Sequence, residues 1–296
     1  MISAENRGPD ARSQTCLITG ASRGLGEILA RAYWQAGANL LLVARGREKL
    51  EQLAASLGSR GGQEVHTIVA DLSDPGAAEN VIRTAYERAS RLDSLVNNAA
   101  IQGPIGPLWK NDWAEWQATL QVDLLSPVAL CRAVVPRMIE QGGGSIVNLS
   151  GGGATGPRAN FTAYATAKAG LVRFSETLAD ELRPHGVRVN CIAPGAMDTS
   201  MLTQVLQEGS DAAGEKEYAQ ALKVQREGGA SLQRVAELCL FVGSDAARGI
   251  TGRLISAVWD PWESLPGHVE ELRGSDIYTL RRIVPADRGM RWDSKP

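Results

Sequence analysis

Two residues with acid–base side chains stand four positions apart in the stretch YATAK, where Tyr164 precedes Lys168. Side chains at positions i and i+4 lie on one face of a helix, so these two can meet if the stretch is helical. Tyrosine has a pKa of about 10 in water, and a neighbouring ammonium group favours the phenolate and lowers that value. The spacing predicts a phenol that donates a proton to a carbonyl oxygen or accepts one from an alcohol.

The stretch TGASRGLG, residues 19–26, is rich in glycine and directly follows the first apolar segment. Gly20, Gly24 and Gly26 would allow a tight turn, a close approach of the backbone to a pyrophosphate, and close packing of the next helix. The free N–H groups and the positive dipole at the start of that helix attract phosphate. This stretch predicts a dinucleotide-binding turn.

The residues after the second apolar segment indicate which dinucleotide is bound. An acidic residue there binds the adenosine ribose of NAD, whereas an arginine accommodates the 2′-phosphate of NADP. This sequence has Ala44 followed by Arg45, and Arg23 lies inside the glycine turn. Two guanidinium groups can bind one phosphate dianion, although both arginines could also be solvated surface residues. We expect NADP(H) as the preferred cofactor and NAD(H) as the alternative.

The pattern of apolar residues indicates the elements that position these groups. Short Val-, Ile- and Leu-rich segments alternate with longer amphipathic ones, which is typical of buried parallel strands covered by helices. The expected strands are 15–19, 39–44, 65–70, 94–98, 145–150, 187–192 and 253–258. The expected helices are 24–36, 47–57, 75–90, 112–140, 162–184 and 231–243. The predicted fold is an α/β, Rossmann-type, doubly wound parallel sheet of about seven strands, in a single domain over residues 14–258.

Three segments fall outside this pattern. Residues 1–13 are polar and are expected to form a flexible N-terminus. Residues 198–230 follow a strand end and are polar, glycine-punctuated and weakly helical, which suits a substrate lid over a crevice. Residues 259–296 form a C-terminal extension in which 268–274 and 275–284 are expected to be helical. The extension either wraps the surface of its own domain or reaches an active site, its own or that of a neighbour.

Composition excludes several classes of protein. The 296 residues carry a net charge of −2 with both signs interspersed, so we expect no nucleic-acid partner. No uninterrupted apolar run reaches the roughly 18 residues of a membrane span, and the N-terminal stretch lacks the apolar core of a signal peptide. The four cysteines lie far apart without metal-ligand spacing, which predicts reduced core thiols and no metal site. We expect a cytoplasmic protein.

Five motifs together give the chain a resemblance to the short-chain dehydrogenase/reductase family over residues 14–258. They are TGASRGLG (19–26), DLS (71–73), NNAA (97–100), YATAK (164–168) and PGAMDT (194–199). The resemblance implies an oxidoreductase that interconverts an alcohol and a carbonyl of a small molecule. It also implies a homodimer or homotetramer, paired through the long helices near 112–140 and 162–184.

The resemblance further implies individual site residues. Tyr164 would be the general acid/base and Lys168 its activator. Asp71 and Leu72 would border the adenine, and Asn97 would hold the backbone on the cofactor side. The full set of implied cofactor-binding residues is Gly20, Ser22, Arg23, Gly24, Leu25, Gly26, Arg45, Asp71, Leu72, Asn97, Tyr164, Lys168, Pro194, Gly195 and Thr199.

The sequence departs from the family pattern at two catalytic positions. Gly151 stands where members carry a serine that binds the substrate oxygen, and loss of such a donor costs about 10²–10³ in rate. Ser150 is the candidate replacement if the glycine run bulges, and backbone N–H groups of the run could also bind the oxygen. Asp123 stands in place of an asparagine in the proton relay, where it would accept a hydrogen bond from water.

These features support an NADP(H)-dependent oxidoreductase that interconverts an alcohol and a carbonyl on a small, polar substrate. The glycine run leaves room for a bulky or polyhydroxylated compound. Two alternatives remain: an NADP(H)-binding regulatory or scaffold protein with little turnover, and an epimerase or dehydratase that uses the same Tyr164 and Lys168 pair.

Overall fold

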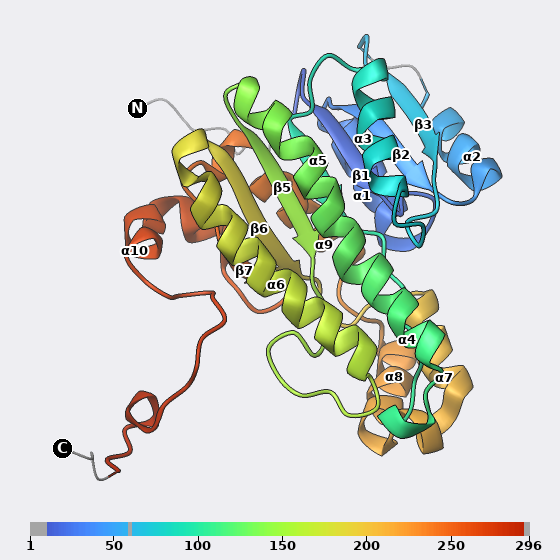
Figure 1. Cartoon of the computed structure of the whole chain (residues 1–296), viewed down its shortest axis with the longest axis vertical. Helices are drawn as coiled ribbons and strands as arrows, with labels where there is room; N and C mark the ends of the chain where they lie inside the picture. The colour runs from blue at the N-terminus through green and yellow to red at the C-terminus, as the bar shows by residue number, and fades with distance from the viewer. Residues whose placement is uncertain (1–10, 59–60, 293–296) are drawn as a thin grey trace.

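The computed structural model describes residues 11–58 and 61–292, and within them seven parallel strands form one sheet in the order β3-β2-β1-β4-β5-β6-β7 (Figure 1). The strands are β1 (Thr15–Thr19), β2 (Asn39–Ala44), β3 (Val65–Val69), β4 (Ser94–Asn97), β5 (Gly144–Leu149), β6 (Val187–Ala193) and β7 (Leu254–Ser256). Every neighbouring pair is parallel. The prediction of a seven-stranded, Rossmann-type α/β fold is confirmed.

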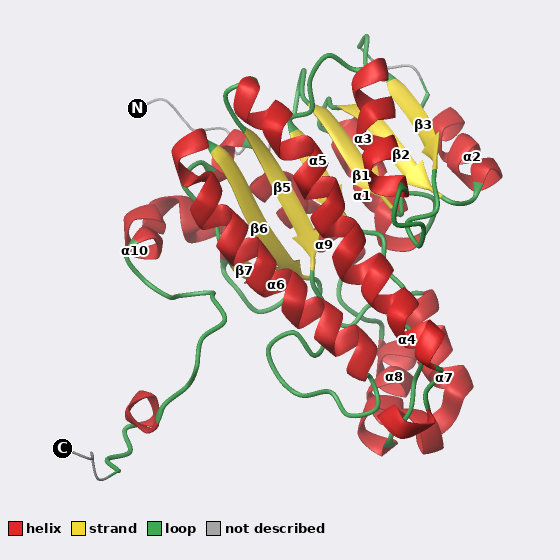
Figure 2. Cartoon of the chain, in the orientation of Figure 1, coloured by secondary structure: helices red, strands yellow, loops and turns green. Residues whose placement is uncertain are grey.

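Helices cover both faces of the sheet (Figure 2). Those on one face are α1 (Gly24–Gln35), α2 (Arg47–Leu57) and α9 (Leu232–Gly243). Those on the other face are α3 (Ala77–Arg88), α5 (Ser126–Glu140) and α6 (Thr162–Leu182). Each layer buries its own apolar cluster against the strands, so strand residues are apolar on both faces. This explains why the strands appear in the sequence as continuous apolar runs.

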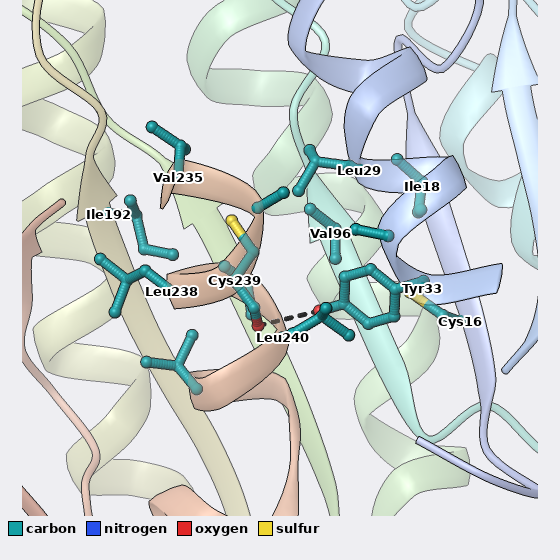
Figure 3. Close-up of a cluster of buried hydrophobic side chains, with 14 of the residues drawn as sticks. Cys16, Ile18, Leu29, Tyr33, Val96, Ile192, Val235, Leu238, Cys239 and Leu240 are labelled. Atoms are coloured by element: carbon teal, nitrogen blue, oxygen red, sulfur yellow. Dashed lines mark hydrogen bonds between the residues drawn. The ribbon is translucent and has the colours of Figure 1, made fainter. Parts of the chain in front are cut away.

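Helix α1 packs against α9 across β1 and β4 in the first of these clusters (Figure 3). Tyr33 of α1 meets Cys239 of α9, and Leu29 and Leu238 belong to the same cluster. Tyr33 is fully buried, and its hydroxyl donates a 2.9 Å hydrogen bond to the carbonyl oxygen of Cys239. A buried tyrosine that satisfies its hydroxyl in this way contributes packing without an unpaired polar atom. All four cysteines are buried and free, as the sequence predicts.

From β1 the chain adds β2 and β3 on one side and then returns to add β4 to β7 on the other, so the topology switches between β1 and β4. In open parallel sheets, ligands bind outside the carboxyl ends of the strands at such a switch point. The loops that leave β1, β4, β5 and β6 at this edge carry the glycine turn, the NNAA stretch, the glycine run and the PGAMDT stretch. The fold therefore gathers the predicted motifs along one edge of the sheet.

The segment predicted as a lid consists of two helices, α7 (Ser200–Ala213) and α8 (Glu215–Glu227), which lie beyond this edge at the same end of the molecule as α4 (Trp113–Leu120) (Figure 1). Its helical content exceeds the sequence expectation. The helices end at glycines with positive φ angles, and a small apolar cluster containing Phe161, Val205 and Ala221 holds the pair together.

The C-terminal extension begins by packing against the domain. Trp262, Leu265 and Leu272 join the core cluster under α9. Residues 269–273 form helix α10 (Val269–Arg273). The predicted helix over 275–284 is wrong, because the buried Arg253 side chain binds the carbonyl oxygens of Ser275 and Ile277 in a turn. The described chain then runs away from the body of the molecule (Figure 1).

Of the predicted flexible N-terminus, residues 1–10 lie outside the described part of the chain. Ala11 is buried and donates a hydrogen bond to Ala36, so the ordered domain already includes this residue. The short helical turns are η1 (Leu108–Lys110), η2 (Gln121–Leu125), η3 (Arg183–His185), η4 (Asp245–Ala247), η5 (Trp262–His268) and η6 (Pro285–Arg288).

One helix among the described residues, the continuous run Trp113–Glu140, has the length and apolar character of a membrane span, although charged residues interrupt its apolar runs. Its α5 part packs against α3, α6 and the sheet, and it carries buried residues of the second core cluster. This is the behaviour of a core helix.

Candidate active site

The predicted acid–base pair lies on α6 at the carboxyl edge of the sheet. Tyr164 is 8% exposed and Lys168 is 2% exposed, so both side chains face inward. The Lys168 Nζ lies 5.5 Å from the centre of the Tyr164 ring. It also donates a 3.1 Å hydrogen bond to the carbonyl oxygen of Leu149, at the end of β5. The i, i+4 spacing thus brings the ammonium group next to the phenol, as expected for a helix.

Asp123 completes this cluster from a different element. It lies in η2, a π-helical turn that interrupts the helix between α4 and α5, and its side chain is fully buried. Its Oδ2 lies 3.4 Å from the Lys168 Nζ, and its Oδ1 accepts a 2.8 Å hydrogen bond from the backbone N–H of Ile101. Turns of this kind often occur at functional sites. Asp123 therefore forms a direct ion pair with Lys168.

Burial and charge act on these three groups in opposite directions. Burial raises the pKa of Tyr164; Lys168 and Arg158 lower it, Asp123 raises it, and the net shift is upward. Lys168 thus lowers the Tyr164 pKa, as the spacing predicts, but burial and Asp123, neither of which is visible in the spacing, outweigh its effect. Burial lowers the pKa of Lys168, but Asp123 and Tyr164 raise it and prevail. Burial also raises the pKa of Asp123, against the opposing effect of Lys168.

The glycine run lies directly against the phenol. A Cβ atom built on Gly151 would collide with the hydroxyl oxygen of Tyr164 and lie 2.9 Å from two of its ring carbons. Ser150 is buried, and its N–H continues the sheet by bonding to Ile192. The Ser150 hydroxyl has no hydrogen-bond partner among the described residues. The structure thus brings Gly151 against Tyr164, and the Ser150 hydroxyl makes no hydrogen bond to Tyr164.

Arg158 is a charged residue near Tyr164 that the sequence interpretation missed. Its guanidinium group stacks on the Phe161 ring at 3.8 Å and lies 5.8 Å from the centre of the Tyr164 ring. Its Nε donates a 2.9 Å hydrogen bond to Glu217 of α8, and its terminal Nη2 lies 2.9 Å from the same oxygen. Arg158 stands out in the sequence only as a charge among small residues, six positions before Tyr164.

The glycine turn has the geometry that the sequence predicts. Gly20 and Gly24 have φ angles of +67° and +57°, which side-chain-bearing residues rarely adopt. A Cβ atom on Gly20 would lie 2.8 Å from the Cα atom of Ala99, and one on Gly26 would collide with the carbonyl oxygen of Gly20. Helix α1 begins at Gly24, so its free N–H groups lie at the carboxyl edge of the sheet.

An asparagine does hold this turn, but it is not the one expected. The Asn98 side chain donates to the carbonyl oxygens of Thr19 and Gly20 at 2.9 and 3.4 Å. Asn97 instead points into the core, where its amide bonds to Asn148 at 2.8 Å. Successive side chains at a strand end face opposite sides of the sheet, so a shift of one residue exchanges the two roles.

Arg45 and Arg23 are exposed at the predicted position for the adenosine end of the cofactor. Arg45 lies 4.0 Å from the Asp71 carboxylate. Partial burial raises the pKa of Asp71, but hydrogen bonds from Ser73 and the charge of Arg45 lower it, so the net shift is downward. Other predicted residues of this region are partly or fully buried: Ser22, Leu25 and Leu72.

The last predicted group follows β6. Pro194 is buried and Gly195 has a φ angle of +83°, while a Cβ atom on Gly195 would lie 2.7 Å from a Val258 methyl group. Thr199 stands at the N-cap position of α7 and its side chain makes no capping hydrogen bond. Its hydroxyl is therefore not committed to the helix.

This arrangement fits a dinucleotide whose phosphates face the start of α1 and whose nicotinamide end faces α6. The turn at Gly20 and Gly26 is too tight for side chains, which is the geometry that lets a backbone approach a pyrophosphate. Lys168 has donors beyond the one bound to Leu149, which can serve ribose hydroxyls. Within the described parts of the chain, no cluster of three or more His, Cys, Asp or Glu side chains could hold a metal ion.

Comparisons with known proteins agree with this geometry. The family model for short chain dehydrogenases matches residues 14–209. Sulfoacetaldehyde reductase 2 of Chromohalobacter salexigens is 36% identical over 82% of this chain and 93% of its own length. D-threitol dehydrogenase of Mycolicibacterium smegmatis is 34% identical over 81% of this chain and 89% of its own length.

Among solved structures, one similar chain is a protein of Beutenbergia cavernae assigned as an NAD(P)-dependent gluconate 5-dehydrogenase, crystallised with NADP bound at low occupancy. It superposes with a TM-score of 0.75 at 28% identity, covering 84% of this chain and 97% of its own. The glycine turn, the Tyr164 and Lys168 pair and these similarities lead to one assignment. The chain belongs to the short-chain dehydrogenase/reductase family, whose members bind NAD(P) and act on alcohol or carbonyl groups.

Proposed function

We propose that the protein is an NADP(H)-dependent oxidoreductase that interconverts an alcohol and a carbonyl on a small polar substrate. The observation that carries this proposal is the buried cluster of Tyr164, Lys168 and Asp123, at the same sheet edge as the glycine turn. When bound, the reduced nicotinamide supplies hydride to the carbonyl carbon. Tyr164 donates its phenolic proton to the carbonyl oxygen, and Lys168 stabilises the phenolate that results.

The preference for NADP(H) over NAD(H) rests on the end of β2. Ala44 leaves the position without an acid for a ribose hydroxyl, and Arg45 and Arg23 are exposed beside it. Asp71 reduces the positive charge of Arg45 only in part, since the ion pair is long and solvated. We infer that a 2′-phosphate binds between the two arginines. The ratio of kcat/KM for NADPH to that for NADH tests this assignment.

The proposed polarity of the substrate rests on the surroundings of Tyr164. Gly151 lies against the phenol, and the guanidinium group of Arg158 lies 5.8 Å from the centre of its ring. Relatives named for sulfoacetaldehyde and D-threitol act on small polar molecules, which supports the same class here. A panel of hydroxylated and acidic aldehydes and ketones, followed by NADPH absorbance, tests it against a matched set of apolar carbonyls.

One observation favours the second candidate, an NADP(H)-binding protein with little turnover. Gly151 provides no hydroxyl for the substrate oxygen, and the Ser150 hydroxyl makes no hydrogen bond to Tyr164. Tight NADPH binding without oxidation on any member of the panel would favour this alternative. Product formation at constant NADPH absorbance would instead favour the epimerase or dehydratase.

We also propose that the protein acts in the cytoplasm as a homodimer or homotetramer. The four cysteines are buried thiols, which suits a reducing compartment. Trp113 and Leu125 are exposed on the long helix that precedes β5, where family members pair. Light scattering at micromolar concentration tests the oligomeric state, and a monomeric mass would contradict it.

A further inference from the structure

The buried ion pair at the active site holds a charge that a neutral asparagine would not supply. Asp123 and Lys168 are 0% and 2% exposed, with their charged atoms 3.4 Å apart. Burying two charges is costly unless each is paired and hydrogen-bonded. Each member makes one hydrogen bond, because Ile101 donates to Asp123 Oδ1 and Lys168 donates to Leu149. The other carboxylate oxygen, Oδ2, has no hydrogen-bond partner among the described residues, so the ion pair with Lys168 is what compensates its burial. The pair therefore has a fixed geometry beside the phenol.

We propose that Asp123 is a positioning residue that acts as the counter-ion of Lys168 and keeps the proton on Tyr164 through and above neutral pH. The protein then presents a proton donor to a carbonyl substrate over a wide pH range. This inference deepens the proposed function and depends on Tyr164 being its acid–base group. It assigns Asp123 to the charge balance of the site rather than to a water relay.

The net charge of the three side chains determines how easily Tyr164 loses its proton. With Asp123 ionised and Lys168 protonated, the cluster is neutral while Tyr164 holds its proton, and loss of that proton leaves one buried negative charge. With an asparagine at position 123, the cluster would start with one positive charge and become neutral on the same loss. Removing a proton from a buried neutral cluster is harder than removing it from a cationic one.

Other charged groups near the cluster do not cancel this effect. From the loop before α6, Arg158 faces the Tyr164 ring and lowers the pKa of its hydroxyl, but Glu217 of α8 pairs with Arg158 and offsets its charge. Cys191 of β6 lies near Lys168, and burial raises the pKa of its thiol to about 12, so it stays neutral in the same range. The counter-charge that reaches Lys168 directly comes from Asp123.

When Tyr164 acts as donor, its O–H bond breaks and its proton passes to the carbonyl oxygen, which becomes the hydroxyl of the product. The phenolate that remains is stabilised by Lys168 and recovers a proton from solvent. Because Lys168 stays paired with Asp123, it is held in place through this cycle. The carboxylate itself neither gains nor loses a proton.

The test compares wild type with Asp123→Asn by pH titration of tyrosinate absorbance in the full-length protein, with NADP present at saturation. Subtracting the same titration of Tyr164→Phe isolates the Tyr164 signal. We expect Asp123→Asn to ionise Tyr164 at a lower pH than wild type. The amide is isosteric and its oxygen can still accept from Ile101, so the fold should be retained.

The matched control is Glu176→Gln, which removes one buried carboxylate charge from the same helix but about three turns away from Tyr164. Its amide oxygen can still accept from the Leu280 N–H. This control should leave the Tyr164 titration where it is in wild type. An equal displacement of the titration in both variants would overturn the proposal, since the effect would then be one of net charge.

A titration of Tyr164 that is unchanged or moves upward in Asp123→Asn would also overturn it. If Asp123→Asn does not fold, the titration of wild type alone tests the inference. Ionisation of Tyr164 at a lower pH than that at which free tyrosine ionises would refute it. Turnover provides a second readout. For each protein, the reduction rate at alkaline pH is divided by its rate at neutral pH. If the pKa of Tyr164 is lower by about 0.5 in Asp123→Asn, this quotient should be about threefold smaller in the variant than in wild type. Absence of turnover in wild type would count against the proposed function alone, since the titration needs none.

Discussion

The cofactor side and the substrate side of the active site are built in different ways. On the cofactor side, the backbone forms the site: Gly20 and Gly26 leave no room for side chains, Gly24 has a positive φ angle, and Asn98 ties the turn to the NNAA stretch. On the substrate side, the site is formed by charged side chains and by a glycine that leaves space beside Tyr164. Gly151 lies against Tyr164, Asp123 pairs with Lys168, and Arg158 reaches across to Glu217.

This difference shows where the chain follows its family and where it departs from it. A pyrophosphate is the same in every relative, so the turn that binds it has few solutions. A substrate differs between relatives, so the residues around it are free to change. Both departures from the family pattern, Gly151 and Asp123, contact the catalytic pair and lie on the substrate side. Substitutions there should alter chemistry, whereas those on the cofactor side should alter cofactor choice.

The largest effect is expected for Tyr164→Phe. The ring and its packing remain while the proton donor is lost, so kcat should fall by about 10²–10⁴-fold with NADPH affinity within a few-fold of wild type. Steady-state kinetics and NADPH fluorescence titration measure the two quantities. Tyr86→Phe is the control, because the Tyr86 hydroxyl lies on α3 without a partner among the described residues. Retained turnover in Tyr164→Phe would remove this residue from its assigned role.

The next largest effect should come from adding a side chain at position 151. A Cβ atom there collides with the Tyr164 hydroxyl, so both Gly151→Ser and Gly151→Ala should displace the phenol and lower kcat/KM by about tenfold to a hundredfold. Gly152→Ser tests the same loop without the collision, since the atom nearest to its Cβ atom would belong to Arg158, at 3.7 Å. A gain in Gly151→Ser but not in Gly151→Ala would show that the missing hydroxyl limits the enzyme.

The sequence predicts the framework well, for physical reasons that particular elements illustrate. Strands β1 and β2 match their predicted bounds, because a strand buried on both faces must be apolar throughout. The glycine turn is equally predictable, since few backbone geometries serve it. The two helices within 198–230 exceed the predicted helical content, because their sequence is polar and their apolar contacts, such as Val205 with Phe161, are tertiary.

The substrate side is less predictable because it depends on contacts between distant residues. The π-helical turn that places Asp123 beside Lys168 leaves no local signal in its sequence. Burial determines the direction in which the pKa of Tyr164 moves, and spacing alone does not contain it. Asn98, rather than the predicted Asn97, holds the glycine turn for a simpler reason. Neighbouring asparagines differ only in the side of the strand end that they face, and this depends on the final register.

A smaller effect is expected on the cofactor side for Arg45→Asp. The change removes a partner of the 2′-phosphate and adds an acceptor for a ribose hydroxyl, so the NADPH to NADH ratio of kcat/KM should fall by about tenfold or more. Arg88→Asp makes the same charge change on the exposed end of α3 and should leave the ratio unaltered. An unmoved ratio in Arg45→Asp would contradict the assignment of NADP(H).

The smallest effect should follow from loosening α8 on the substrate side. Glu217→Gln weakens the charged hydrogen bonds with Arg158, which join α8 to the loop before Tyr164. The pair is partly exposed, so the loss should be modest, with a KM for the carbonyl substrate raised about two- to fivefold and little change in kcat.

Glu227→Gln is the matched control for Glu217→Gln, because Glu227 pairs only with Lys223 and Arg226 on α8 itself among the described contacts. It removes the same charge from the same helix without touching the loop, so its KM should stay at the wild-type value. If α7 and α8 close over the substrate, Glu217→Gln should raise the substrate KM and leave the NADPH KM unchanged. Equal changes in both KM values would mean that the Arg158 contact supports the whole site rather than its substrate side. A fall in thermal stability without any change in KM would mean that α8 is a fixed wall, which would break the distinction between the two sides at this helix.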